Sequence, residues 1–239
     1  MGASNNAPGN GLVAYFPFNG NANDESGNMN NGTVYGNAAL TVDRFNRRNN
    51  AYYFDGIDDY IITEENDAFD NLDSGAVSFW MKIESAPTEI QSVLLSYSTD
   101  YSVNSIYSFV IRNNLKLEVI YKYKGAITPE IISVAALELR KWYHVVFVAD
   151  GKNRIKFYLN NQEIPTTFIS HGTSANGSEW FADLNGVKYY PHFITIGAQK
   201  RNKQTPNTFF HGVLDDIRVY DHPLSEAEID SLYHENGWK

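Results

Sequence analysis

The segment Ala76-Val-Ser-Phe-Trp-Met-Lys-Ile83 places large apolar side chains at every second position, namely Val77, Phe79, Met81 and Ile83. Successive side chains of a β-strand point to opposite faces of its sheet, so these four residues share one face. An apolar period of two over eight residues predicts a strand with one buried face.

The same period recurs along the chain. It is found in residues 115–123 and 155–159, and residues 142–148 form a run rich in aromatic and β-branched side chains. Dipeptides that tolerate left-handed backbone punctuate these runs: Asn31-Gly32, Asn113-Asn114, Asp150-Gly151 and Asn160-Asn161. Many strands separated by turns predict an antiparallel sandwich.

One helix is expected, close to the end of the chain. Ser225-Glu-Ala-Glu228 has the pattern of a capping box, with Ser225 as N-cap and Glu228 at the third helical position. Ile229, Leu232 and Tyr233 then fall on one helical face, and Gly237 stands where a C-terminal cap belongs.

Composition restricts the class of protein. The 239 residues include 19 Lys and Arg against 28 Asp and Glu, a net charge of −9, which argues against nucleic acid and anionic membrane surfaces as partners. There is no cysteine, and no apolar run is long enough to span a bilayer.

Because no break in composition marks a linker, we expect a flexible leader at residues 1–10 and one domain at residues 11–239. The leader has no charged segment followed by an apolar segment, which is the pattern of an export signal. A chain from which such a signal had been removed would look the same.

Several blocks occur in a characteristic order. They are residues 11–28, Tyr53-Phe-Asp-Gly-Ile-Asp-Asp-Tyr-Ile61, Trp142-Tyr-His-Val-Val146, and Phe210-His-Gly-Val-Leu-Asp-Asp-Ile-Arg-Val-Tyr220 with Leu224-Ser-Glu-Ala-Glu-Ile229. Together they resemble the laminin-G-like, concanavalin A-like jelly-roll domains. The resemblance implies an all-β sandwich of two antiparallel sheets with a short C-terminal helix. It also implies an extracellular or cell-envelope role in binding glycans or proteins, and often one structural calcium ion.

The chemistry of one loop agrees with a calcium site. Ca²⁺ takes six to eight oxygen ligands, and Asn19-Gly-Asn-Ala-Asn-Asp24 concentrates such oxygens on a glycine-containing loop. The resemblance implies ligands at Asn19, Gly20, Asp24 and Asp215. The alternative is turn chemistry, in which the Asn and Asp side chains bind their own backbone.

Other acidic residues are given other roles. Asp216 is expected to point away from Asp215, because neighbours on a strand face opposite sides, or to pair with Arg218. Asp55, Asp58 and Asp59 are expected in turns.

Catalytic patterns are not found. Retaining glycoside hydrolases hold two carboxyl groups about 5–5.5 Å apart, and no predicted strand carries acidic residues at the spacing that would place them on one face. The six histidines lack metal-site spacing, and no serine stands in a nucleophile elbow. We therefore expect no enzymatic activity, with a glycoside hydrolase or lyase as the weaker alternative.

A segment of about 30 residues between Asn161 and Ile194 is a candidate ligand loop. Long loops are often functional, and this one contains His171, Trp180, Phe181, Tyr189 and Tyr190, whose rings could stack on sugars. The alternative is that Trp180 and Phe181 anchor the segment as a satellite core.

The expected function is a non-catalytic binding module, secreted or at the cell surface. Its expected partner is a glycan or glycoconjugate. A protein-interaction or adhesion domain, with a surface protein as partner, is the alternative.

Overall fold

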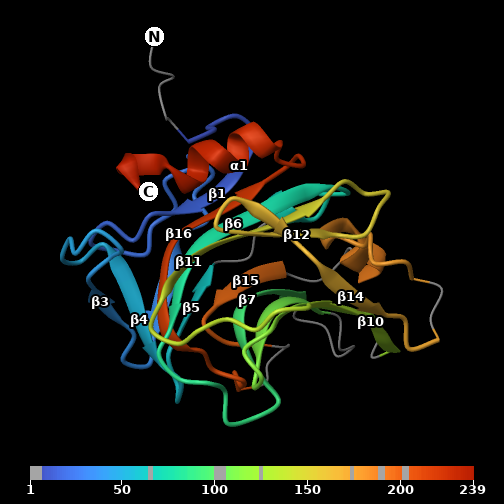
Figure 1. Cartoon of the computed structure of the whole chain (residues 1–239), viewed down its shortest axis with the longest axis horizontal. Helices are drawn as coiled ribbons and strands as arrows, with labels where there is room; N and C mark the ends of the chain where they lie inside the picture. Colours follow the sequence, from blue (N-terminus) through green and yellow to red (C-terminus); the bar gives the residue numbers. More distant parts are fainter. Residues whose placement is uncertain are drawn as a thin grey trace.

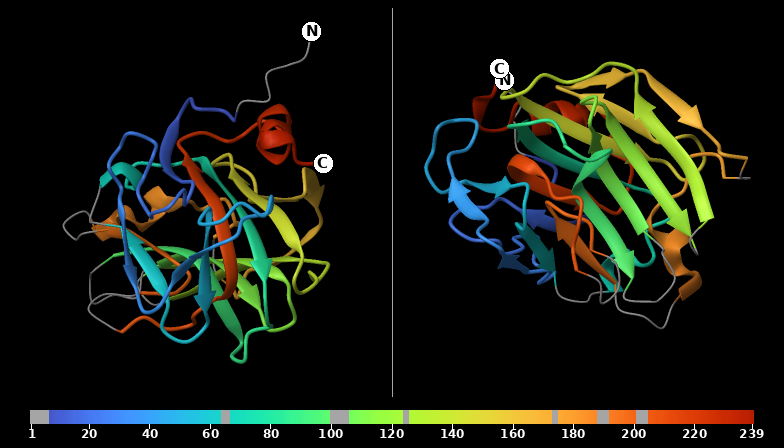
Figure 2. Two further views of the ribbon diagram at one scale, coloured as in Figure 1. Left: turned by 90° about the vertical axis from the view of Figure 1, so that its left-hand side faces the viewer. Right: turned by 90° about the horizontal axis from the view of Figure 1, so that it is seen from below.

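The computed structural model describes residues 7–63, 67–99, 106–123, 126–172, 175–187, 192–200 and 205–239. Two antiparallel sheets pack face to face (Figure 1, Figure 2). Sheet A has the order β13 (Gln162–Ile164), β12 (Lys156–Leu159), β11 (Trp142–Ala149), β6 (Gly75–Ile83), β16 (His211–Tyr220), β4 (Ala51–Asp55) and β3 (Ala39–Thr41), and β1 (Leu12–Phe16) pairs with β16.

Sheet B has the order β14 (Thr166–Ile169), β10 (Ala126–Ser133), β9 (Leu117–Tyr123), β8 (Ile106–Arg112), β7 (Gln91–Thr99), β15 (His192–Ile196), β5 (Tyr60–Thr63) and β2 (Gly32–Tyr35). The remaining regular elements are α1 (Glu226–Tyr233) and the short 3-10 helices η1 (Asp67–Phe69), η2 (Phe181–Val187) and η3 (Glu235–Gly237). The predicted all-β sandwich with one C-terminal helix is confirmed. No helix in the described ranges has the length and apolar character needed to cross a membrane.

The predicted strand faces agree with the core. Val77, Phe79, Met81 and Ile83 of β6 all belong to the main cluster between the sheets. The intervening residues Ala76, Ser78 and Trp80 are buried as well, because α1 covers the outer face of sheet A, whereas Lys82 is half-buried. Leu224, Ile229 and Leu232 pack there against side chains of β6, β11, β12 and β16.

The helix begins as expected and ends earlier. Ser225 is the N-cap, and the capping box with Glu228 is complete. The last helical residue is Tyr233, and His234 is the C-cap. Gly237, with φ of +81°, ends the following 3-10 turn instead.

Two other expectations need correction. Asn31-Gly32 forms no hairpin turn, since Gly32 begins β2 and the Asn31 side chain accepts a hydrogen bond from the Asp24 amide. The segment after Asn161 is less of a loop than expected, because β13 and β14 add edge strands to the two sheets. Of the expected leader, residues 1–6 lie outside the described ranges, and the Pro8 carbonyl accepts a hydrogen bond from the Tyr220 hydroxyl at 3.0 Å.

Candidate functional site

Asp24, the first expected calcium ligand, is engaged by four protein donors. Its Oδ1 accepts hydrogen bonds from the backbone N–H groups of Tyr15 and Ser26, at 2.8 and 2.9 Å. Its Oδ2 accepts from the Ser26 hydroxyl and the Asn30 N–H, both at 2.9 Å. The carboxylate therefore ties the loop to β1. These contacts agree with the alternative given above, in which Asp side chains of the loop bind nearby backbone groups.

The neighbouring loop residues are held in the same way. The Asn19 Oδ1 accepts from the Asn50 amide at 2.9 Å. The Gly20 N–H donates to the carbonyl groups of Phe18 and Asn49. The Asn50 contact occupies one lone pair of the Asn19 side-chain oxygen.

Asp215, the ligand expected from the far end of the chain, pairs with an arginine. Arg44 Nη1 lies 2.8 Å from Asp215 Oδ2 and 2.7 Å from Asp216 Oδ2, and the Arg44 side chain is fully buried. The guanidinium also stacks on the rings of Trp80 and Phe45, at 4.4 and 4.7 Å. The Arg44 guanidinium occupies the position beside Asp215 that a calcium ion would take, so Asp215 in this arrangement does not fit a calcium site.

The expected orientation of Asp216 was wrong for a local reason. The register of β16 against β6 shifts between Asp215 and Arg218, and Asp216 has a φ of +48°. Such a bulge breaks the alternation of faces, so both carboxylates reach Arg44. The Asp216 Oδ1 accepts from the Tyr15 hydroxyl at 2.8 Å, and Arg218 lies 3.7 Å away. Burial alone would raise the pKa of Asp216, but Arg218 and Arg44 hold it below its ordinary value.

One acidic cluster in the described ranges has its carboxylate oxygens within 4.8 Å of one another, at Asp55, Asp58 and Asp59. Asp59 accepts backbone hydrogen bonds from Asn37 and Asp55, and Asp55 accepts one from Ile57. The turn role expected for Asp55 and Asp59 agrees with these contacts.

Two of the aromatic residues expected to contact a ligand, Trp180 and Phe181, lie in the core. Trp180 and Phe181 are both 0% exposed and stack on each other at 4.8 Å. They pack against Tyr107 of β8, with ring centroids 5.2 and 5.3 Å away. Rings without solvent access offer no face to a sugar, so their placement favours the satellite-core alternative. Tyr189 and Tyr190 lie outside the described residues.

His171 marks a polar network that the sequence did not reveal. Its Nε2 lies 3.2 Å from Glu130 of β10, and Arg112 Nη1 of β8 lies 2.9 Å from Glu118 of β9 and 3.3 Å from Glu130. Glu118 is 1% exposed, and its Oε2 is buried without a hydrogen-bond donor. Burial, opposed by Arg112 and assisted by Glu130, raises the pKa of Glu118 to about 8. The signal in the sequence was a glutamate among the apolar residues at the start of β9, but its partners come from other strands.

This network lies on the outer face of sheet B, the face turned away from the core. One register row crosses all eight strands of that face: Thr33, Ile62, Thr195, Ser96, Ser108, Ile120, Glu130 and Ile169. The segment that follows β15 crosses the small residues in the middle. Ser96 donates to the Ala198 carbonyl, and Gln199 donates to the Ser108 hydroxyl at 3.4 Å.

A cavity of about 500 Å³ opens beside this crossing segment. Gln91, Gln199, Asn207 and Thr208 line it together with Glu89 and the exposed Ile90. Gln91 pairs with Arg112 in the ladder of β7 and β8, which places this amide-lined cavity next to the Arg112 network. Amide groups both donate and accept hydrogen bonds, so the lining suits a neutral polyhydroxylated ligand.

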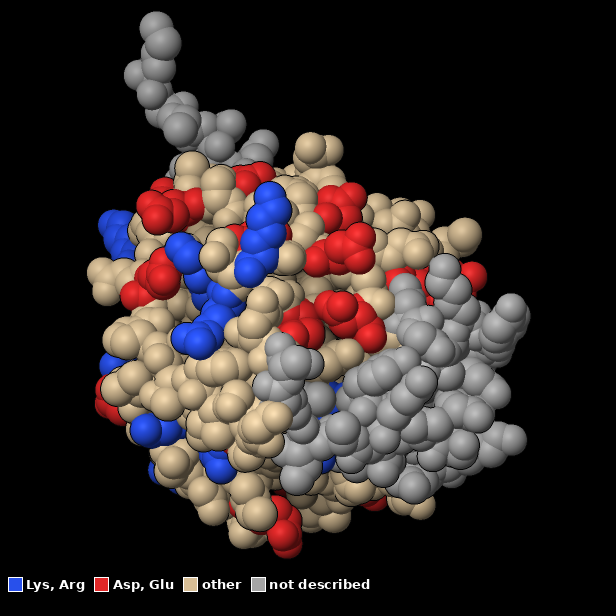
Figure 3. All heavy atoms as spheres, turned by 90° about the vertical axis from the view of Figure 1, so that its right-hand side faces the viewer, with Lys and Arg blue, Asp and Glu red and all other residues tan. Residues whose placement is uncertain are grey.

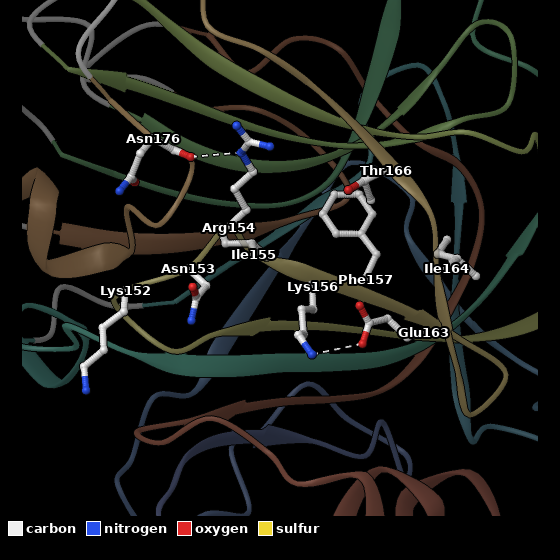
Figure 4. Close-up of a pocket in the computed structure, with 10 residues that line it drawn as sticks. All are labelled: Lys152, Asn153, Arg154, Ile155, Lys156, Phe157, Glu163, Ile164, Thr166 and Asn176. Atoms are coloured by element: carbon white, nitrogen blue, oxygen red, sulfur yellow. Dashed lines mark hydrogen bonds and ion pairs between the residues drawn. The ribbon is translucent and has the colours of Figure 1, made fainter.

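A second cavity of about 510 Å³ lies beside β12, β13 and the start of β14, here called the rim cavity (Figure 4). Lys152, Arg154 and Lys156 line it, but their charged groups point in different directions (Figure 4). Glu163 neutralises Lys156 at 3.0 Å. The side of the molecule shown in Figure 3 likewise carries basic side chains beside acidic ones. The rim cavity therefore has no convergent charge.

The fold and these surfaces can be compared with known proteins. The family model of the concanavalin A-like lectin/glucanases superfamily matches residues 54–230, so the chain belongs to this superfamily. No curated protein matches the chain.

Solved structures share the fold at low identity. Domain 4 of AbnA, a GH43 extracellular arabinanase from Geobacillus stearothermophilus solved with arabinotriose, has a TM-score of 0.62 and 20% identity, covering 93% of this chain and 98% of that one. The botulinum neurotoxin serotype D binding domain gives 0.65 and 16%, with 95% and 52% covered. The Trypanosoma rangeli sialidase with the inhibitor DANA gives 0.64 and 19%, with 95% and 33% covered. The chain thus spans about half of the toxin domain and a third of the sialidase. At these identities the likeness establishes the fold alone.

Proposed function

We propose that this chain is a non-catalytic carbohydrate-binding module that binds a neutral glycan at the amide-lined cavity of sheet B. The observation that carries the proposal is this cavity, which Gln91, Gln199, Asn207 and Thr208 line together with the apolar Ile90 and one carboxylate, Glu89. Ligand sites commonly combine an apolar wall with a few polar groups that fix orientation. The lectin and glucanase superfamily and the arabinotriose bound by domain 4 of the arabinanase support a sugar as ligand.

Two features support binding without catalysis. Glu118 and Glu130 share Arg112, and Glu118 is buried, so this carboxyl pair does not present two groups to opposite sides of a sugar bond. Another buried group, His144 of β11, lies beside Tyr233 of α1, with ring centroids 6.0 Å apart, and its Nε2 is 2.9 Å from the Ser78 hydroxyl. Burial and the charges of Arg218 and Arg44 lower the pKa of His144 to about 3, so the ring is neutral near neutral pH, cannot act as a general acid there and is only a weak base.

We propose as part of the same function that the module acts outside the cell or at its envelope. A glycan-binding module acts where glycans are exposed, outside the cell or at its envelope, as does the extracellular arabinanase that contains the similar domain. Calcium is left out of this proposal, because the Arg44 guanidinium already pairs with both Asp215 and Asp216.

A glycan array followed by calorimetry with the best glycan tests the proposal. We expect Gln91→Ala to weaken binding at least about tenfold, the equivalent of about 1.4 kcal/mol. Gln162→Ala, an exposed amide on β13 of sheet A, is the matched control and should leave binding unchanged. A blank array for the wild-type chain would contradict the proposal and favour a protein partner. Release of new reducing ends from the bound glycan would contradict the non-catalytic part.

A further inference from the structure

A partly exposed aromatic pair lies at the β2 edge of sheet B. Tyr35 of β2 and Tyr60 of β5 are direct cross-strand partners. Their ring centroids are 4.8 Å apart and their planes differ by 3°. Tyr35 remains 44% exposed, although it is among the largest side chains of the sheet. We call these two residues the tyrosine platform.

The tyrosine platform faces the same side as the amide-lined cavity. Val34 pairs with Ile61, a core residue, so their neighbours Tyr35 and Tyr60 point to the outer face of sheet B. Because β2 is the last strand of the sheet, no further strand covers Tyr35 from outside.

The turns beside the platform are tightly packed. A Cβ added to Gly36, whose φ is +71°, would lie 2.6 Å from the Asp58 carbonyl oxygen. The Asn37 N–H donates to Asp59, which connects the turn after β2 with the turn before β5. The backbone that carries the two rings is thus held in place, and the rings stack on each other. Preorganisation of this kind reduces the entropy lost on binding.

We propose that the tyrosine platform stacks on one ring of the same glycan whose other end enters the amide-lined cavity, so that the ligand is an oligosaccharide and not a single sugar. This inference rests on the proposed function. From β2 to β7 the sheet order gives three strand spacings, or roughly 14 Å across the strands. A monosaccharide cannot reach both places, whereas a chain of several rings lying across the strands can.

The stacking partner follows from the shape of the surface. The two rings stack face to face, so each covers one face of the other, and the exposed Tyr35 on the edge strand keeps its outward face for a ligand. Tyr combines an apolar body with a polar tip. A pyranose or furanose ring has the matching arrangement of C–H faces and peripheral hydroxyls. A protein partner would instead call for a larger contiguous apolar area.

A chain-length series tests the inference. Linear arabino-, xylo- and cello-oligosaccharides of one to six rings would be titrated into the full chain by calorimetry. For the type that binds, we expect affinity to rise with length in the wild type. Tyr35→Ala should weaken binding of the longest oligosaccharide about tenfold while leaving the shortest bound ligand unaffected.

Two further variants separate stacking from damage to the fold. Tyr35→Phe keeps the ring and should retain the dependence on length. Val34→Ala, on the same strand but the opposite face, should behave as the wild type. If Tyr35→Ala binds every length as the wild type does, the platform is not part of the site and the inference fails, although the proposed function stands. If the wild type binds no oligosaccharide and no arrayed glycan, the proposed function itself fails.

Discussion

Arg44 and Asp215 form an ion pair of 2.8 Å in which the two side chains are 0% and 2% exposed. The residues are far apart in the sequence, and the pair joins the loop after β3 to the central strand β16. Burial raises the pKa of Asp215, as does the charge of Asp216, whereas Arg44 opposes the shift. The internal cation thus lies among the acidic residues where the sequence analysis expected calcium.

Removal of the Arg44 charge should destabilise the protein strongly. Arg44→Met keeps much of the apolar stem but leaves Asp215 and Asp216 buried without their shared partner. Breaking a buried pair from one side costs about 3–5 kcal/mol, which urea unfolding would measure. Arg140→Met, at a side chain 79% exposed, should change the free energy of unfolding by less than about 1 kcal/mol. Equal losses of unfolding free energy in both variants would show that the buried Arg44 pair stabilises the fold no more than an exposed pair does.

Calcium should leave the stability of the wild-type chain unchanged. A bound ion at 100 times its dissociation constant would add about 2.7 kcal/mol and raise Tm by several degrees. We therefore expect melting curves in excess calcium and in EDTA to coincide. The Asp24→Ala variant should melt at a lower temperature in both buffers alike, because it loses hydrogen bonds to Tyr15, Ser26 and Asn30. A fall in Tm on EDTA addition that Asp24→Ala abolishes would restore the calcium expectation.

Local patterns carried the prediction of the fold. The alternation in residues 76–83 predicted β6 and its core face, and Ser225 with Glu228 predicted the start of α1. These features depend on neighbours in the sequence. Asp216 shows the limit, because a bulge with positive φ turned a strand residue to the face that alternation excludes.

The candidate site was harder to predict for a related reason. The Arg112, Glu118 and Glu130 network joins three strands, and the amide-lined cavity joins β7 to the segment after β15. Only the order and register of strands bring such residues together. Trp180 shows a second limit of the sequence. An aromatic residue in a long segment can either fill the core or contact a ligand, and the sequence does not distinguish the two.

Trp180→Ala should act on stability rather than on binding. The ring is fully buried and packs against Phe181, Tyr107 and Phe109. Truncating a buried tryptophan costs about 3–5 kcal/mol, whereas Trp180→Phe should cost much less. Thermal unfolding gives the stability, and calorimetry well below the Tm of the variant gives glycan affinity. A folded Trp180→Ala protein with normal stability and lost binding would return this residue to the ligand site.

Glu118 should make the protein less stable as the pH rises. Its pKa is about 8 in the folded chain against an ordinary value of 4.5, so between these values the folded state binds more protons than the unfolded state. The free energy of unfolding must therefore fall with rising pH across that window. The groups that face Glu118 are Arg112 and Glu130, and His171 lies against Glu130.

Urea unfolding of Glu118→Gln between about pH 5 and 9 should show a free energy of unfolding that depends less on pH than in the wild type. At the alkaline end the variant should be more stable than the wild type by up to a few kcal/mol. Glu163→Gln, at a half-exposed pair on β13, should follow the wild-type profile. Parallel profiles for wild type and Glu118→Gln would mean that Glu118 is already ionised at neutral pH.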